Sequence, residues 1–129
     1  MQMHNFSQQS LLIKAYDGHH IQIHHTPYCG PCLVSAAGVH ALPSLHTLFD
    51  SIIALSPKIV LIACNSPQSL QDVGFLLRFQ AQAIGIEILE YGAAYRTYNI
   101  LAEEQRAVVL AILTPDYRLE KTDTPNPVR

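Results

Sequence analysis

The chain has 129 residues, of which 49% are hydrophobic and 14% are charged, with a formal net charge of -2. This length and composition suit one folded domain with its own hydrophobic core, and they exclude the disordered and fibrous classes. A charge so close to zero does not attract nucleic acid, so no nucleic-acid partner is expected. We predict a single domain over 1–129, with an ordered core at about 10–115 and a mobile polar N-terminus and Pro-containing C-terminal tail.

The N-terminal segment does not have the pattern of a secretory signal. Residues 1–9 are polar and lack the charged start and apolar stretch of a secretory signal. The longest apolar run, Ile59 to Cys64, is far shorter than the ~18 residues that cross a bilayer. Three cysteines, an odd number, do not suggest a disulfide scaffold. We therefore expect a cytoplasmic protein that does not span a membrane.

The first predicted elements are two β-like runs, at 11–16 and 20–24. The Asp17-Gly18-His19 segment between them favours a hairpin, because Gly accepts positive φ at little cost. A short apolar segment follows at 29–36, and a loop is predicted at 37–43.

Strands and helices alternate in the rest of the chain. Ser44 is the expected N-cap of a helix with apolar residues every three or four positions. A helix at about 69–83 is expected to bury one stripe of apolar residues and to end in a glycine C-cap at Gly85. That stripe consists of Leu70, Val73, Leu77 and Ile84, with Phe75 and Phe79 beside it.

Three strands and one further helix complete the pattern. The strands are predicted at 59–64, 86–89 and 107–113, and the helix at 93–104. The continuous apolar run at 59–64 is typical of a strand that helices cover on both faces. The predicted fold class is therefore α/β: a three-layer arrangement with helices on both faces of a mixed β-sheet, plus the N-terminal β-hairpin.

The most conspicuous motif is Cys29-Gly30-Pro31-Cys32, which resembles the active site of thioredoxins. In thiol–disulfide exchange Cys29 would be the nucleophile and Cys32 the resolving thiol. The flanking pattern differs from that fold, because the strand after Pro57 is followed by helices where a thioredoxin has a hairpin. We favour a framework role in which Cys32 is buried in a strand, and redox chemistry is the alternative.

Four histidines, at 19, 20, 24 and 25, precede this tetrapeptide. A zinc site of two His and two Cys is an alternative interpretation. However, His24 and His25 point to opposite faces of a strand, and one Cys-x-x-Cys pair supplies only half of such a site. Exposed strand histidines are the preferred interpretation. We expect no metal and no cofactor.

The segment from Gly85 to Arg106 resembles a known family of small domains, with Gly85-Ile86 and Arg96-Thr97-Tyr98-Asn99 as the matching motifs. This family is shared by the mitochondrial complex I assembly factor three, the adipogenesis-associated domain protein, and many bacterial and archaeal proteins of unknown function. Weaker similarity extends over about 11–115. The resemblance implies a three-layer α/β fold and an association with the assembly of respiratory complexes. It implies no reaction.

The chain departs from the family at two places. Ala63-Cys64-Asn65 stands where the family has Gly-Thr-Gly after the central strand, and Tyr95 stands where the family often has Cys. Those glycines would let a ligand approach the backbone closely, so an anion site of that kind is not expected here. A role that depends on the thiol does not carry over to Tyr95.

The last candidate is the helical face that carries Arg96 and Asn99. Arg96 can bind an anion, or it can pair with a carboxylate such as Glu90, and the structural use is preferred. If this face lines a pocket, the predicted ligand-binding residues are Tyr95, Arg96 and Asn99, together with Asn65 in the loop after the central strand.

The sequence contains no Ser-His-Asp order, phosphate loop or paired-carboxylate motif. The preferred function is therefore a non-enzymatic accessory or interaction domain. Its expected partners are proteins, among them respiratory or membrane complex subunits, and self-association into a homodimer is also expected. The alternatives are a thiol–disulfide oxidoreductase and a small-ligand or anion binder near Arg96.

Overall fold

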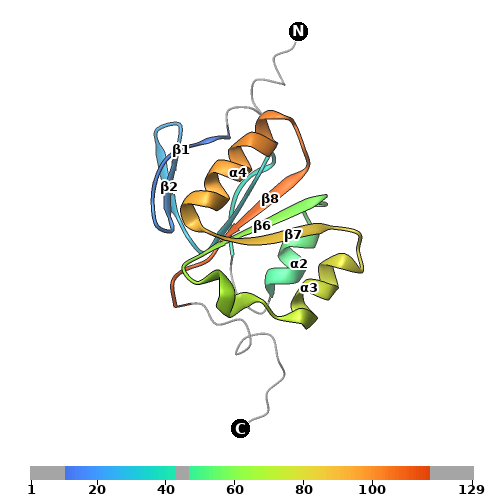
Figure 1. Cartoon of the computed structure of the whole chain (residues 1–129). Helices are drawn as coiled ribbons and strands as arrows, with labels where there is room; N and C mark the ends of the chain where they lie inside the picture. Colours follow the sequence, from blue (N-terminus) through green and yellow to red (C-terminus); the bar gives the residue numbers. More distant parts are fainter. Residues whose placement is uncertain (1–10, 43–46, 117–129) are drawn as a thin grey trace.

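The computed structural model describes residues 11–42 and 47–116, and the predictions for Ser44 and for the two ends lie outside these ranges. The first strands are β1 (Ile13–Asp17), β2 (His20–Ile23) and β3 (Thr26–Cys29), which form an antiparallel sheet in the order β1-β2-β3 (Figure 1). The hairpin prediction is confirmed: Gly18 turns the chain with a φ of 62°. The strand β3 was not predicted, and it follows a turn in which His24 has a φ of 59°.

A second, five-stranded sheet forms the centre of the molecule. Its strands are β4 (Cys32–Ser35), β5 (Gly38–Ala41), β6 (Ile59–Cys64), β7 (Gly85–Glu90) and β8 (Val108–Ile112), in the order β5-β4-β8-β6-β7. The strand β6 is parallel to β7 and β8, whereas β4 is antiparallel to β5 and β8. The sheet is therefore mixed, as predicted. The loop predicted at 37–43 is wrong, because Val39 pairs with Val34 and extends the sheet by one strand.

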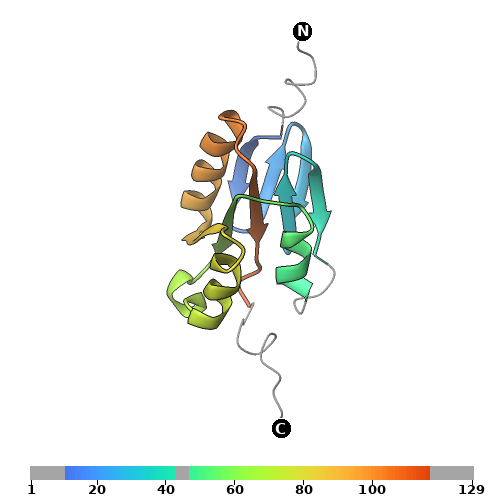
Figure 2. The ribbon, with the colours of Figure 1, turned by 90° about the vertical axis from the view of Figure 1, so that its right-hand side faces the viewer.

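Helices lie on both faces of this sheet, which confirms the three-layer prediction (Figure 1). The helices α2 (Leu48–Ile53) and α3 (Val73–Gln80) lie on one side, with the short 3₁₀ helix η2 (Pro67–Leu70) next to them. The long helix α4 (Tyr91–Glu103) lies on the other side. Figure 2 shows α4 and α2 on either side of β8. No helix in the described ranges is long and apolar enough to cross a membrane.

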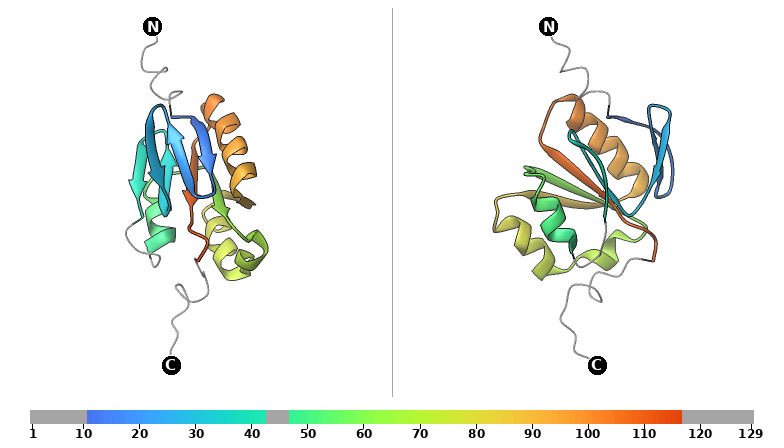
Figure 3. Two further views of the ribbon diagram at one scale, coloured as in Figure 1. Left: turned by 90° about the vertical axis from the view of Figure 1, so that its left-hand side faces the viewer. Right: turned by 180° about the vertical axis from the view of Figure 1, so that it is seen from behind.

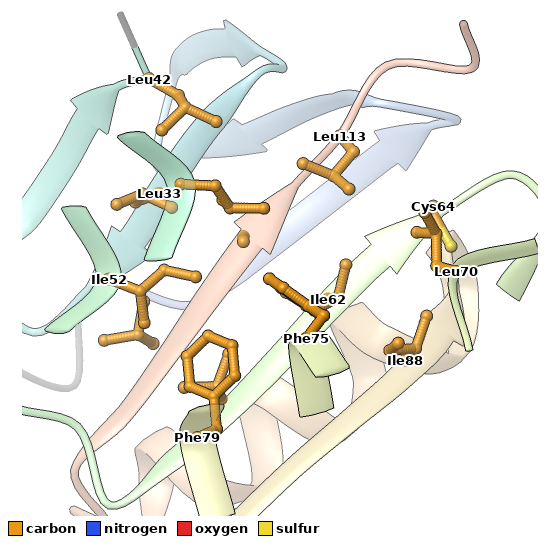
Figure 4. Packing of buried hydrophobic residues seen from close by; sticks show 14 of the residues in the cluster. Leu33, Leu42, Ile52, Ile62, Cys64, Leu70, Phe75, Phe79, Ile88 and Leu113 are labelled. Atoms are coloured by element: carbon orange, nitrogen blue, oxygen red, sulfur yellow. The ribbon is translucent and has the colours of Figure 1, made fainter. Parts of the chain in front are cut away.

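Two hydrophobic cores result, one on each face of the five-stranded sheet. The side chains of β6 point alternately into the two cores, because successive side chains of a strand lie on opposite faces of the sheet. Val60 and Ile62 pack toward α2 and α3, and Figure 4 shows the Ile62 side chain of β6 next to Phe75 of α3. Leu61 and Ala63 pack toward α4 and the three-stranded sheet.

The predicted apolar stripe of the helix at 69–83 is confirmed for Leu70 and Ile84, which are buried, and wrong for Val73 and Leu77. Val73 and Leu77 are 69% and 53% exposed, whereas Phe75 and Phe79 are buried. The chain leaves the helical path between η2 and α3, at Gln71, and a new helix begins after Asp72. This break shifts the helical phase, so that the two phenylalanines face the sheet. Phe75 and Phe79 bury more apolar area in that position than Val73 and Leu77 would.

The predicted C-cap at Gly85 is also wrong. Ala83 adopts the left-handed conformation, with a φ of 61°, and the Ile84 amide donates to the Phe79 carbonyl oxygen at 3.1 Å. That bond satisfies one of the carbonyl groups that a helix leaves open at its end. Gly85 instead begins β7 and pairs with Ile59.

Candidate functional site

The Cys29-Gly30-Pro31-Cys32 tetrapeptide is the crossing between the two sheets. Cys29 is the exposed last residue of β3, and Cys32 is the buried first residue of β4. The Gly30 amide donates to the carbonyl oxygen of His19 at 2.9 Å, on the three-stranded sheet. The Pro31 carbonyl accepts from the Leu42 amide at 3.1 Å, beside the five-stranded sheet. The tetrapeptide therefore connects two strands, and no helix begins at it.

The electrostatic environment of Cys32 disfavours thiolate chemistry. Burial, with a smaller contribution from Cys29, raises the pKa of Cys32 to about 11. In a reactive dithiol site the nucleophilic thiol has its pKa lowered by a helix N-terminus or a neighbouring cation, and no helix begins at Cys29. At neutral pH Cys32 thus stays a neutral thiol in the core, where it packs as a small hydrophobic side chain.

Gly30 occupies its position in the tetrapeptide for a steric reason. A Cβ atom at Gly30 would lie 2.9 Å from the carbonyl oxygen of Ile112 and 3.1 Å from its Cγ2 atom. Backbone of β8 cannot move away as the end of a long side chain can. A glycine is therefore needed where the crossing chain passes over β8, whatever chemistry Cys29 has.

Of the four histidines considered from the sequence, His20 lies in a strand as predicted, but the strand prediction is wrong for His24 and His25, which form the turn between β2 and β3. His20, His24 and His25 are exposed, and His20 pairs with Cys29 across the two strands. The rings of His19 and His20 have their centroids 4.3 Å apart. Over 11–42 and 47–116, no group of three or more His, Cys, Asp and Glu residues is placed to hold a metal ion.

The Arg96-Thr97-Tyr98-Asn99 segment lies on α4, beside the three-stranded sheet (Figure 3). The Tyr98 hydroxyl donates to the carbonyl oxygen of Leu11 at 3.2 Å. Asn99 accepts from the Ile13 amide and donates to the Ile13 carbonyl oxygen, both at 2.9 Å.

Tyr95, one residue before this motif, has the same kind of role. Its hydroxyl donates to the Gly18 carbonyl oxygen at 2.7 Å, and its ring is 1% exposed. Tyr95 and Asn99, both predicted to bind a ligand, thus hold the backbone of the β1–β2 hairpin against α4. A buried backbone group that lacks a hydrogen-bond partner lowers the free energy of unfolding, so these side chains stabilise the position of the hairpin.

Arg96 differs from its neighbours because its side chain is exposed. Its Nη1 atom donates to the Tyr16 hydroxyl at 3.3 Å. The pairing with Glu90 considered from the sequence is not formed; among the described residues the ion pair found joins Arg106 to Glu104. Both the Tyr16 hydroxyl and the Arg96 guanidinium lie over Gly92, where a Cβ would be 2.9 Å and 3.1 Å from them.

A hollow of about 330 Å³ adjoins Gly92, at the carboxyl ends of the parallel strands β6 and β7. Open α/β sheets bind their ligands at such strand ends. Its lining consists of Gly18, Cys64, Asn65, Glu90, Tyr91 and Gly92. The Tyr91 hydroxyl donates to the Leu113 carbonyl oxygen at 2.6 Å and is therefore engaged within the fold.

The structure thus separates the four predicted ligand-binding residues. Asn65 lines the hollow, Arg96 lies at its border, and Tyr95 and Asn99 hold the hairpin. The sequence reasoning missed Gly92 as part of this site. Its signal was present, since a glycine four residues before Arg96 leaves room for the guanidinium on the same helical face.

Solved structures of several bacterial proteins are similar to this chain. XCC1710 from Xanthomonas campestris is 29% identical, with 78% of this chain and 82% of that chain covered and a TM-score of 0.66. A Mth938-like domain protein from Bordetella pertussis is 21% identical, with 92% and 94% covered and a TM-score of 0.68. A protein of Bartonella henselae named an outer membrane protein is 20% identical, with 81% and 94% covered and a TM-score of 0.62.

These likenesses agree with the α/β architecture described above, and the two below 25% identity concern the fold alone. No curated protein matches the chain. The family called Protein of unknown function (DUF498/DUF598) matches residues 13–113, which include all eight strands and the helices α2, α3 and α4. The chain belongs to this family of proteins of unknown function.

Proposed function

We propose that this chain is a non-enzymatic accessory domain that binds another protein, a subunit of respiratory complex I or of another membrane complex, on its cytoplasmic side. The resemblance of the Arg96-Thr97-Tyr98-Asn99 segment to complex I assembly factors supports the choice of partner. The observation that carries the proposal is the outer face of α3, which presents apolar side chains to solvent.

This face is defined by Val73 and Leu77, which lie one helical turn apart and are 69% and 53% exposed. The two charged side chains next to them make contacts within the fold: the Asp72 carboxylate accepts from the Phe75 amide, and the Arg78 guanidinium lies 4.0 Å from the centre of the Phe49 ring on α2. Apolar side chains that gather on one exposed face, with few charges between them, are typical of surfaces that bind proteins.

The accessory role is favoured over the alternative, in which Cys29 and Cys32 carry out thiol–disulfide exchange. The nucleophilic thiol of such an exchange reaction is activated at a helix N-terminus or beside a cation, whereas Cys29 is the last residue of a strand and no helix begins at the tetrapeptide. Cys32 would be the resolving thiol, and its burial and raised pKa disfavour the thiolate that would attack the mixed disulfide on Cys29. The polar groups of Tyr98 and Asn99 are engaged with the hairpin backbone, which leaves them no part in binding a substrate.

The test is the assembly of complex I in cells that lack the gene. We expect the amount of fully assembled complex on native gels to fall in the deletion strain and to recover with the wild-type gene. The variant Val73→Asp/Leu77→Asp is expected not to restore assembly, because two carboxylates in the interface would have to lose their water.

A matched control is Ile100→Asp, which adds a charge at another exposed apolar position, on α4. It is expected to restore assembly as the wild type does. Unfolding curves of the purified variants check that each one is folded. Unchanged assembly in the deletion strain would overturn the proposed partner, and full rescue by the α3 double variant would overturn the proposed surface.

A further inference from the structure

The hollow at the ends of β6 and β7 has a composition that points to a small polar ligand. Its volume of about 330 Å³ lies at the lower end of the range for ligand sites. The exposed residues Asn65, which follows β6, and Glu90, which ends β7, belong to its lining. The ligand therefore has to be small and to offer a hydrogen-bond donor or a positive charge to Glu90.

The floor of the hollow adds no charge. Burial raises the pKa of Cys64 to about 11, so this thiol is neutral under physiological conditions. The Tyr91 hydroxyl is engaged by the Leu113 carbonyl. Glu90 is thus the charged side chain of the lining.

A positive charge borders the hollow on the side of Gly92. The Arg96 guanidinium folds back over this glycine, and its hydrogen-bond partner there is the Tyr16 hydroxyl. The helix dipole does not stabilise the guanidinium at this position, because cations are favoured at the C-terminal end of a helix. Arg96 therefore has unused capacity for a carboxylate, which it binds through two parallel N–H groups.

We propose that the hollow binds a free amino acid, whose ammonium group is held by Glu90 and whose carboxylate is held by Arg96. Both charges of such a ligand have an opposite charge available, since Glu90 belongs to the lining and Arg96 lies beside Gly92 of the same lining. Asn65 supplies a further amide for hydrogen bonds, and Gly92 leaves the room in which the guanidinium lies. This site is independent of the α3 face, so the two proposals fail separately.

The test is a titration of the isotope-labelled wild-type protein, followed by the amide signals of residues around Asn65 and Gly92. L-alanine and L-glutamine are the zwitterionic probes; propionate and ethylamine each carry one of the two charges. We expect a saturable shift with an amino acid, with a dissociation constant of roughly 1 mM or tighter. Propionate and ethylamine are expected to bind at least ten times more weakly.

Three variants connect the binding to the named residues. Glu90→Gln and Arg96→Gln are each expected to weaken amino acid binding tenfold or more. Gly92→Ala is expected to do the same, because its Cβ displaces the ends of the Tyr16 and Arg96 side chains. Arg106→Gln, at the far end of α4, is the matched control and is expected to bind like the wild type.

Three results would overturn this site. The first is the absence of a saturable shift with either amino acid in a protein whose spectrum shows that it is folded. The second is equal binding of propionate or ethylamine, which would mean that one charge alone is recognised. Wild-type affinity in both Glu90→Gln and Arg96→Gln would likewise remove the assignment.

Discussion

Asn99 of α4 binds both backbone polar atoms of Ile13 in β1, although 86 residues separate the two in the sequence. The Ile13 amide donates to Oδ1, and Nδ2 donates to the Ile13 carbonyl oxygen, each at 2.9 Å. A neighbouring strand would offer the same pair of groups. The side-chain amide thus takes the place of a strand at the edge of the three-stranded sheet, and it joins that sheet to α4.

This pair of bonds predicts the effect of Asn99→Ala. The variant leaves the partly buried amide and carbonyl of Ile13 without their partner, so we expect a loss of about 1–3 kcal/mol in unfolding free energy. Urea unfolding measures the loss. Hydrogen exchange is expected to accelerate in the β1–β2 hairpin before the rest of the domain.

Thr97→Ala is the matched control, since it also removes a polar side chain from α4 and is expected to change stability by less than about 0.5 kcal/mol. If Asn99→Ala were as harmless as this control, the amide would not hold β1 in place.

The three thiols are expected to differ sharply in reactivity. Cys29 is exposed, whereas Cys32 and Cys64 are buried. In the native protein an aromatic disulfide reagent should therefore label one thiol quickly, and Cys29→Ser should abolish this fast phase. The two buried thiols should react only when the protein unfolds. Fast labelling of Cys32 in the folded protein would contradict its place in the core and would revive the redox alternative.

Alkaline pH is expected to destabilise the domain through its buried thiols. Burial raises the pKa of Cys32 and Cys64 from 9.0 to about 11. Between pH 9.0 and about 11 these two thiols lose their protons in the unfolded chain but keep them in the folded chain. The stability is therefore fully present below pH 9 and declines as the pH rises toward 11, by about 1.4 kcal/mol per pH unit for each thiol at most.

Urea unfolding from pH 8 to 10 measures this slope, and the range stays below the region in which buried Tyr98, with its pKa raised to about 12, contributes strongly. Cys64→Ala is expected to reduce the slope. Val60→Ala also removes core contacts but leaves the slope unchanged, because valine does not titrate. Identical slopes in these two variants would show that Cys64 does not contribute.

The alternating strands and helices after β5 could be predicted from the sequence because each one has a local cause, whereas β3 and β5 were missed. The run from Ile59 to Cys64 is apolar throughout, which is typical of a strand covered on both faces, and it forms β6. The orientation of α3 could not be predicted in this way. It depends on the break at Gln71 and on the space that the sheet leaves for Phe75 and Phe79, and both are tertiary effects.

The candidate site shows the same limit. Asn65 could be placed near the start of α4, since strand ends and helix starts meet at one edge of a parallel sheet. The roles of Tyr95 and Asn99 could not be predicted, because their hydrogen-bond partners are backbone atoms of Gly18 and Ile13 rather than side chains. A sequence does not show which backbone atoms a fold brings beside a helix.

Gly30→Ala distinguishes a structural role of the tetrapeptide from a chemical one. The variant keeps both cysteines but sets a Cβ 2.9 Å from the Ile112 carbonyl oxygen, so β8 or the crossing chain has to shift. Overpacking of this kind costs about 1–3 kcal/mol, measured as a loss of unfolding free energy. The control Gly85→Ala also lies in the five-stranded sheet, but its Cβ would meet its nearest neighbour at 3.9 Å. We expect this control to be neutral or slightly stabilising, because alanine loses less conformational freedom on folding than glycine. Equal stability of the two variants would mean that the crossing has room for a side chain, and the glycine would then need another explanation.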